Sequence, residues 1–301
     1  MTSDKEILIT GASGMLGSKV SSVLAEKGFQ ILAVFDSNEK FVPDGKNVKK
    51  THLDITGEIN PNRFKNTHTI IHCAAITDVN FCELNKPFCR EVNVAGTKNL
   101  INLAKSLNAQ FIYISTPMVF SGRKGNYSEN DETGPLNYYG KTKSQAEKAV
   151  LKYGKGLVVR VNPIGKRPLG AHPSFMQWFM DTASSNRSFS LFTDVVINPV
   201  STATLADFLS KIIDKFKPGI LHLGSRDRVN KAEIWEEVLE LFPDYSGTVT
   251  RLSVDKTRDG KAASRPHEMW LNVDKAVGLG YSLPSWKEEV RIVLNEILNR
   301  K

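Results

Sequence analysis

Tyr139 and Lys143 stand four residues apart at the start of a predicted helix, so both side chains face the same way. A phenol with an ordinary pKa near 10 is a poor acid or base at neutral pH. A nearby ammonium and a helix N-terminus both favour the phenolate, so we expect the pKa of Tyr139 to be lowered. Thr116 follows the apolar run 110–115 and brings a hydroxyl to the same sheet edge. Together the three groups predict carbonyl reduction or its reverse.

Three glycines at a three-residue spacing stand between a short apolar run and an amphipathic helical pattern. Glycine lets the chain turn tightly and lets backbone approach a ligand, while the helix that follows offers unpaired N–H groups and its positive dipole end. This loop is therefore expected to bind the pyrophosphate of a dinucleotide. The predicted contacts in the loop are Gly11, Ser13, Gly14, Met15, Leu16 and Gly17.

Asp36 closes the second predicted strand, 19 residues beyond Gly17. A carboxylate at this place can accept hydrogen bonds from an adenosine ribose and would repel a 2′-phosphate, which favours NADH. Lys40 is nearby and weakens that preference. Both NAD(H) and NADP(H) therefore stay open as coenzymes.

Apolar, β-rich runs alternate with helical patterns through the first half of the chain. This alternation predicts an α/β fold, with a Rossmann-type doubly wound parallel sheet and helices on both faces. Ligands of such a sheet bind outside the carboxyl ends of its strands. The predicted strands are 6–10, 30–35, 47–53, 69–72, 110–115 and 157–161, and the predicted helices are 15–27, 87–107 and 139–153.

The pattern changes after Arg160, where a stretch rich in proline and glycine begins. Helices are predicted at 175–183, 203–213, 231–241 and 285–299, a strand at 219–223, and irregular or extended chain at 188–200 and 246–258. We infer two units. A dinucleotide-binding Rossmann domain spans residues 1–165 plus about 200–223, and a smaller discontinuous substrate-binding lobe spans 166–199 and 224–301.

The formal net charge is +8 over 301 residues, but the lysines and arginines form no basic tract, so no nucleic-acid partner is expected. A mildly positive protein attracts ligands that carry phosphates.

No apolar run approaches the roughly 18 residues of a membrane span, and no signal-peptide profile occurs, so we expect a cytoplasmic protein without a membrane partner. The cysteines and histidines show no metal-ligand spacing, and His72 is expected to be a satisfied interior or pocket-wall group. A homodimer stays open.

Several longer motifs extend these patterns and run from end to end, although they thin after Arg160. They are the glycine loop, His72-Cys-Ala-Ala-Ile-Thr-Asp78, Val92-Asn-Val-Ala-Gly-Thr97, Ser115-Thr116 with Val119-Phe120, Glu129-Asn-Asp131, Pro135-Leu-Asn-Tyr-Tyr-Gly-Lys-Thr-Lys143 and Arg265-Pro266. In these motifs the chain resembles the extended short-chain dehydrogenase/reductases, and within them the dTDP-4-dehydrorhamnose reductase group.

The resemblance implies NAD(P)H-dependent reduction of the C4 ketone of a nucleotide-linked 4-keto-6-deoxy sugar, for deoxysugar and polysaccharide biosynthesis, without a metal. It implies that Tyr139 protonates the alkoxide, that Lys143 holds the nicotinamide ribose and tunes the tyrosine, and that Thr116 hydrogen-bonds the carbonyl oxygen. Further coenzyme contacts are implied for Asp54, Ile55, Ala74 and Ala75, and contacts with the nucleotide sugar for Thr77, Val119, Phe120, Asn162 and Arg265.

The chain also departs from its apparent relatives. Pro117 and Met118 stand where sugar-nucleotide 4,6-dehydratases carry acidic residues, so water elimination is not expected, and the reductases usually carry an aspartate in place of Pro117. After the sixth strand the aromatic residue of the reductases is missing, and Phe175 or Trp178 are candidates to replace it. Arg265 either pairs with a diphosphate or serves packing between the lobes.

Two other functions fit the same motifs. A nucleotide-sugar 4-epimerase uses the same threonine, tyrosine and lysine but keeps its nicotinamide bound between half-reactions. A non-catalytic, NAD(P)-binding regulatory subunit, similar to the beta subunit of methionine adenosyltransferase, retains the fold and much of the motif set. Fold similarity cannot separate these, because function depends on the residues of the site.

Overall fold

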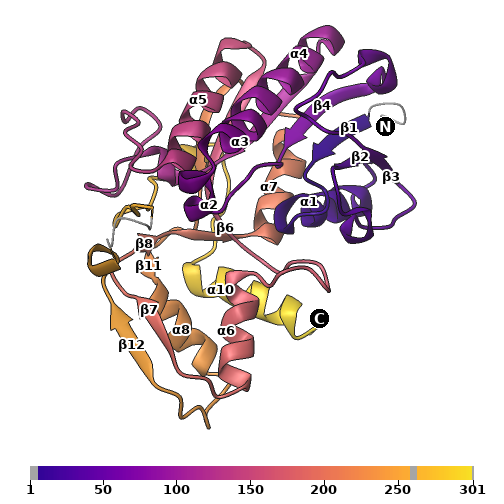
Figure 1. The fold of residues 1–301 in the computed structure, drawn as a ribbon. Coiled ribbons are helices and arrows are strands. Elements are labelled where there is room, and N and C mark those ends of the chain that lie inside the picture. Colours follow the sequence, from indigo (N-terminus) through magenta and orange to yellow (C-terminus); the bar gives the residue numbers. More distant parts are fainter. Residues whose placement is uncertain (1–5, 258–262, 300–301) are drawn as a thin grey trace.

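The fold is described by a computed structural model that covers residues 6–257 and 263–299 (Figure 1). Residues 1–5 of the first predicted unit, and 258–262 and 300–301 of the second, lie outside the described residues. The central feature is a parallel sheet with the strand order β10-β6-β5-β4-β1-β2-β3, and β9 pairs with the end of β6. This confirms the predicted fold class. The strand order runs outward from β1 in both directions, which creates a crevice at the carboxyl ends of β1 and β4.

The strands of this sheet follow the apolar runs of the sequence closely. Those at the centre are buried on both faces, as parallel strands covered by helices must be. The strands are β1 (Glu6–Thr10), β2 (Gln30–Phe35), β3 (Val48–His52), β4 (Thr67–His72), β5 (Gln110–Ser115), β6 (Gly156–Ile164), β9 (Pro199–Ser201) and β10 (Gly219–Leu223).

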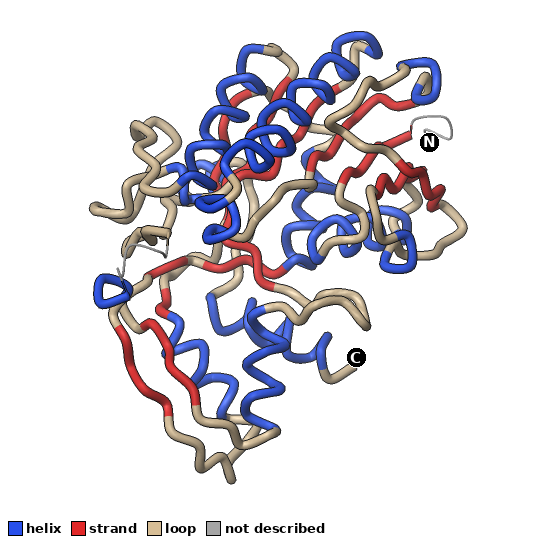
Figure 2. Tube along the Cα trace, in the orientation of Figure 1, coloured by secondary structure: helices blue, strands red, loops and turns tan. Residues whose placement is uncertain are grey.

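Helices cover both faces of the sheet (Figure 2). On one face, α1 (Met15–Glu26) and α7 (Thr202–Ile212) share a core with the strands. On the other face, α4 (Thr97–Leu107) and α5 (Tyr138–Lys152) form a second core. Apolar residues at helical spacing on each helix supply the buried stripe. Shorter helical pieces are α2 (Val79–Leu84), α3 (Lys86–Arg90), a π-helical segment (Glu91–Gly96) and 3-10 turns at Glu39–Phe41, Pro61–Phe64, Pro117–Val119 and Val254–Thr257.

Most of the chain after β6 gathers around a separate core below the sheet in Figure 1. This core is formed by α6 (Phe175–Ser184), α8 (Lys231–Leu239), α10 (Trp286–Ile297), and the paired strands β7 (Phe189–Phe192) with β12 (Val249–Leu252) and β8 (Val196–Ile197) with β11 (Val229–Asn230). The segment around α9 (Asp274–Gly278) behaves differently, because Val273, Ala276 and Leu283 join the core beside the main sheet. Part of the chain that we assign to the substrate lobe from sequence therefore packs against the sheet.

The predicted helix 87–107 is the clearest difference from the expected elements. The structure breaks it into α3, the π-helical segment and α4. Apolar spacing predicts helix over the whole stretch, but it does not reveal a local change from α to π hydrogen bonding. Such π segments are often found at functional sites.

Within the described ranges, no helix combines the length and the apolar character needed to cross a bilayer.

Candidate active site

The turn between β1 and α1 is shaped by two glycines. Gly11 has a φ of 66°, and a Cβ there would lie 2.8 Å from the backbone nitrogen of Ala74. A Cβ on Gly17 would lie 2.2 Å from the carbonyl oxygen of Gly11. Only glycine at these two positions lets strand, turn and helix approach so closely.

The N-terminus of α1 is open to a ligand. Its N-cap residue, Gly14, makes no side-chain capping bond, and the first turn holds no acidic residue. Unpaired N–H groups and the positive end of the helix dipole are therefore available to an anion. The arrangement fits the pyrophosphate of a nicotinamide dinucleotide.

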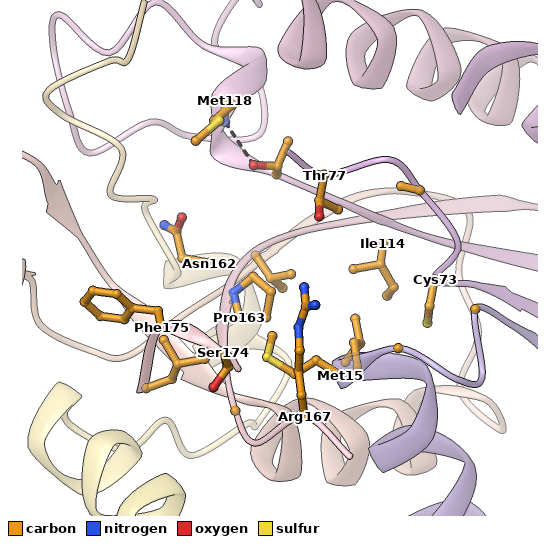
Figure 3. A pocket seen from close by; sticks show the side chains of 18 of the residues that line it. Met15, Cys73, Thr77, Ile114, Met118, Asn162, Pro163, Arg167, Ser174 and Phe175 are labelled. Atoms are coloured by element: carbon orange, nitrogen blue, oxygen red, sulfur yellow. Dashed lines mark hydrogen bonds between the residues drawn. The ribbon is translucent and has the colours of Figure 1, made fainter. Parts of the chain in front are cut away.

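A cavity of about 540 Å³ lies beside this turn (Figure 3). It lies at the carboxyl edge of the main sheet, and α6 and α8 contribute to the opposite wall. Thr116, Tyr139 and Lys143 all line it, together with Gly11 and Gly17. The structure thus brings the three predicted acid–base residues to the loop that is expected to hold the coenzyme.

Thr116 is held so that its hydroxyl proton is available. Its Oγ1 accepts a hydrogen bond from the backbone N–H of Met118 at 3.2 Å, drawn as a dashed line in Figure 3. Thr116 also lies close enough to Tyr139 to influence its pKa. A hydroxyl whose oxygen already accepts can donate to a carbonyl oxygen placed beside it.

The expectation of a lowered pKa for Tyr139 is wrong. Burial raises the pKa of Tyr139 well above its usual range, and the nearby Thr116 hydroxyl offsets this only in part. The Lys143 ammonium donates to the carbonyl oxygen of Ile114 at 2.8 Å, and the N-terminus of α5 is satisfied by its own cap and by Glu83. Tyr139 is therefore protonated at neutral pH, which is the form that can donate to an alkoxide.

Lys143 is buried, and burial lowers its pKa to about 8. The Glu147 carboxylate, one helical turn further along α5, opposes this shift and favours the charged amine. The Nζ atom also lies 4.1 Å from the ring centroid of Tyr113. Lys143 therefore carries its proton at neutral pH but loses it more easily than an exposed lysine.

A buried polar network holds Glu147 in place. Arg160 donates to both carboxylate oxygens, at 2.7 and 3.0 Å, and Ser115 donates to one of them at 2.5 Å. His222 accepts from Arg160 at 3.2 Å, and burial together with the Arg160 charge lowers the pKa of His222 to about 3. Because the histidine stays neutral, Arg160 and Glu147 form one compensated ion pair in the core.

His72 is a satisfied interior group, as expected. Thr97 donates to the carbonyl oxygen of Asn93 at 2.8 Å, so its oxygen accepts from Nε2 of His72 at 3.0 Å. Nδ1 then accepts from Thr10 at 2.7 Å, and Thr10 accepts from the backbone of Ala74 at 3.2 Å. Burial lowers the pKa of His72 to about 3, so this chain of bonds stays neutral.

The π-helical segment places Asn93 against the loop after β4. Its side chain exchanges two hydrogen bonds with the backbone of Ile76, at 2.8 and 3.0 Å, and donates to Thr142 of α5 at 3.1 Å. Asn93 thereby fixes the loop that carries Ala75 and Thr77, which both line the cavity. Sequence reasoning assigned no role to this residue.

The predicted coenzyme contacts divide into two groups. Those that line the cavity or the hollow next to it are Gly11, Ser13, Gly14, Met15, Leu16, Gly17, Ala75, Tyr139 and Lys143. Asp36 is exposed, Asp54 accepts from Thr56 at 2.7 and 2.8 Å, and Ile55 is buried. Ala74 contributes backbone to the glycine turn instead. These four residues lie outside the wall of the cavity.

The predicted substrate contacts also divide. Thr77 and Asn162 line the cavity, whereas Val119 and Phe120 do not. Both of the latter are fully buried, and Phe120 stacks on Tyr127 with 4.1 Å between ring centroids. Their position corrects the expectation of substrate contact, because the 3-10 turn after Thr116 directs them into the core.

The wall that faces the sheet contains one aromatic and one basic residue. The sequence leaves the choice between Phe175 and Trp178 open and assigns no role to Lys231. Phe175 lines the cavity and Trp178 does not, so Phe175 is the aromatic wall on this side. Lys231 also lines it, and burial and the nearby Arg265 lower the pKa of Lys231. Arg265 is thus close to the cavity without forming its wall. The capping box that begins α8 at Asn230 was the available sequence signal for Lys231.

A second hollow, of about 470 Å³, continues from the cavity past the glycine loop. Its walls include Ser13, Asn38 and Lys40. It lies where the loop after β2 approaches the glycine turn, which is the side on which a Rossmann fold holds adenosine. Within the described residues, no group of His, Cys, Asp and Glu side chains is arranged to hold a metal ion.

Comparison with known proteins agrees with this geometry. The family described as RmlD substrate binding domain matches residues 5–299. A dTDP-4-dehydrorhamnose reductase of Mycolicibacterium smegmatis is 31% identical over 95% of this chain and 84% of its own. Methionine adenosyltransferase 2 subunit beta of Xenopus tropicalis is 33% identical over 93% of this chain and 84% of its own. The crystal structure of a Bacillus anthracis dTDP-4-dehydrorhamnose reductase in complex with NADP superposes with a TM-score of 0.82, at 23% identity, over 97% of this chain and 99% of that one.

Proposed function

Because the chain belongs to the RmlD substrate binding domain family, within the extended short-chain dehydrogenase/reductases, we propose that it reduces the C4 ketone of a nucleotide-linked 4-keto-6-deoxy sugar. The protein is an NAD(P)-dependent oxidoreductase of the dTDP-4-dehydrorhamnose reductase group. The observation that carries the proposal is that Thr116, Tyr139 and Lys143 line one cavity with the glycine loop.

A bound reduced nicotinamide supplies the hydride for this reaction. Thr116 donates a hydrogen bond to the carbonyl oxygen and keeps its proton, and this bond stabilises the negative charge that develops on the oxygen. Tyr139 then gives its proton to the alkoxide, and its raised pKa keeps it protonated until then. Lys143 holds the nicotinamide ribose, and its positive charge stabilises the phenolate left on Tyr139.

The second core is proposed to bind the nucleotide sugar. Phe175 offers an apolar face, and Lys231 and Arg265 offer positive charge for a diphosphate. The coenzyme is NADH or NADPH. A cytoplasmic location and a homodimer belong to the same proposal, and sedimentation velocity would test the dimer.

The test is a panel of nucleotide-linked 4-keto sugars offered with NADH and with NADPH. The expected result is loss of absorbance at the reduced-nicotinamide band with at least one sugar, together with a product of one C4 configuration. No turnover with any member of the panel would remove the proposed activity. Tightly held NAD that survives dialysis, with interconversion of C4 epimers, would indicate a 4-epimerase instead.

A second candidate function rests on the 33% identity to methionine adenosyltransferase 2 subunit beta. This chain would then bind NAD(P) without turnover and act through a partner protein. The discriminating measurement combines coenzyme titration with size-exclusion chromatography in the presence of a methionine adenosyltransferase catalytic subunit. Coenzyme binding, no turnover and a stable hetero-complex would favour the regulatory role.

A further inference from the structure

Residues 165–173, which we call the strap, lie between β6 and α6 and contribute to the walls of both the main cavity and the second hollow. At one end, Gly165 lines the main cavity. Further along, Pro168 and Gly170 line the second hollow, and a Cβ on Gly170 would lie 3.8 Å from the ring of Phe41, beyond β2. The strap therefore reaches from the substrate side of the site to the adenosine side.

The backbone of the strap is anchored. Gln177 of α6 accepts from the backbone N–H of Arg167 at 2.8 Å and takes part in the capping box that begins α6 with Ser174. Lys166 donates to the carbonyl oxygen of Glu296 at 3.0 Å and to the Asn299 side chain at 3.1 Å. Hydrogen bonds to α6 and to the C-terminal end of α10 thus hold the strap backbone in place around Arg167.

The side chain of Arg167 points from the strap into the cavity beside Met15 (Figure 3). Its Nε atom is buried and has no hydrogen-bond partner, and no carboxylate of the described chain lies within ion-pair distance of it. A buried N–H donor without an acceptor is costly, because it has lost its hydrogen bonds to water and has gained none inside the protein. The other strap cation, Lys166, has its partners, so the unpaired state is specific to Arg167.

Arg167 faces a second positive feature. The main cavity and the second hollow share three residues, which are Gly14, Met15 and Arg167. Gly14 and Met15 form the uncapped start of α1, where no acidic residue balances the helix dipole. Two positive groups that face one cavity without a counterion are favourable only when an anion lies between them.

We propose that Arg167 binds the pyrophosphate of the dinucleotide from the side opposite α1, so that the strap clamps the coenzyme between the two lobes. The inference rests on the proposed function, because it takes the anion to be the coenzyme. The planar guanidinium offers two parallel N–H donors, which match adjacent phosphate oxygens. The strap thereby contributes a coenzyme-binding residue from outside the dinucleotide-binding fold.

The test measures dissociation constants by calorimetry for NADPH and for ADP-ribose, which carries the pyrophosphate without the nicotinamide. Arg167→Ala should weaken both by about 10- to 100-fold, because a charge-assisted bidentate contact is lost. Arg167→Lys should restore only part of the lost affinity, since an ammonium group cannot offer the two parallel N–H donors of a guanidinium. Adenosine, followed by ligand-observed NMR because it binds weakly, should lose less than twofold.

Lys211→Ala is the control for net charge, because it removes an exposed cation of α7 that lines neither hollow, and it should leave both dissociation constants within twofold. Thermal unfolding of Arg167→Ala without ligand should give a Tm equal to or above that of the wild type, because an unsatisfied donor is removed, while the rise in Tm with ADP-ribose should shrink. Wild-type affinity of Arg167→Ala for ADP-ribose would overturn the clamp and leave the reductase proposal intact. Failure of the wild type itself to bind NADPH and ADP-ribose would overturn both.

Discussion

The two walls of the cavity differ in how their polar groups are satisfied. On the sheet side, Lys143 lines the wall, and the buried residues His72, Asn93 and Arg160 lie outside the cavity lining. All four have hydrogen-bond partners inside the protein. On the facing side, the Arg167 guanidinium has a buried nitrogen without a partner. Lys231, on the same side, lies over the ring of Phe175 at 5.2 Å and has no carboxylate at ion-pair distance in the described chain.

This difference separates two tasks. A fully bonded wall keeps its groups in place before a ligand arrives, and such preorganisation lowers the barrier of the chemical step. A wall with unpaired cations gains most when an anionic ligand arrives, so it contributes to binding. Changes on the sheet side should therefore act on kcat or stability, and changes on the facing side on affinity.

The largest effect is expected from Tyr139→Phe. Removal of the proton donor should lower kcat by about 100- to 10,000-fold, which is the range that a positioned general acid contributes. The dissociation constant of the coenzyme should change less than threefold. Stopped-flow turnover and fluorescence titration measure the two quantities, and an equal loss of both would assign Tyr139 a structural role instead.

The next effect concerns stability. Glu147→Ala leaves Arg160 as an unpaired buried charge, so the free energy of unfolding should fall by about 3–5 kcal/mol. Asp207→Ala is the control, since Asp207 forms only exposed pairs with Lys27 and Lys211 and should cost about 1 kcal/mol or less. Urea unfolding compares the two variants. If the two variants lost similar free energies of unfolding, the buried Arg160–Glu147 ion pair would contribute no more to stability than an exposed pair.

The sheet side could be predicted largely from sequence, and the facing side could not. Gly11, Tyr139 and Lys143 belong to short motifs in which spacing alone decides which side chains lie together. Arg167 and Lys231 reach the cavity only through the packing of α6 and α8, which no local pattern encodes. The proline- and glycine-rich strap has the composition of an ordinary loop.

The sequence was also misleading where burial decides the outcome. The resemblance assigned Val119 and Phe120 to the substrate because they follow Thr116, yet both are in the core. The spacing of residues within a motif does not determine which way their side chains point after the chain has passed through a 3-10 turn. The pKa of Tyr139 was expected to fall for a similar reason, since the four-residue spacing to Lys143 gives proximity but not the desolvation that raises it.

The pH dependence tests the sheet side without a substitution. Burial lowers the pKa of Lys143 to about 8, and the protonated amine is the form that supports the phenolate. As pH rises through about 8, the free enzyme loses that proton, so kcat/KM for ketone reduction should fall about tenfold per pH unit above it. Lys143→Arg should move this limb to higher pH. A profile that stays flat to pH 10 would contradict this role of Lys143.

On the facing side, Lys231→Ala should raise KM for the nucleotide sugar about tenfold, because a cation is removed from the wall that receives the diphosphate. The coenzyme dissociation constant and kcat should change less than threefold. Lys211→Ala, which removes an exposed cation of α7, is the control for net charge. A loss confined to kcat would assign Lys231 to the chemical step and break the division between the two walls.

The smallest effect concerns coenzyme choice. Lys40 lines the second hollow next to Ser13, whereas Asp36 lies outside both hollows. Because Lys40 is exposed, its attraction for a 2′-phosphate is screened, and Lys40→Ala should lower the NADPH/NADH ratio of kcat/KM by roughly two- to fivefold. Asp36→Ala is the matched variant, and an unchanged ratio removes Asp36 from coenzyme selection. A shift toward NADPH in Asp36→Ala, with none in Lys40→Ala, would instead restore the selection by Asp36 that the sequence favours.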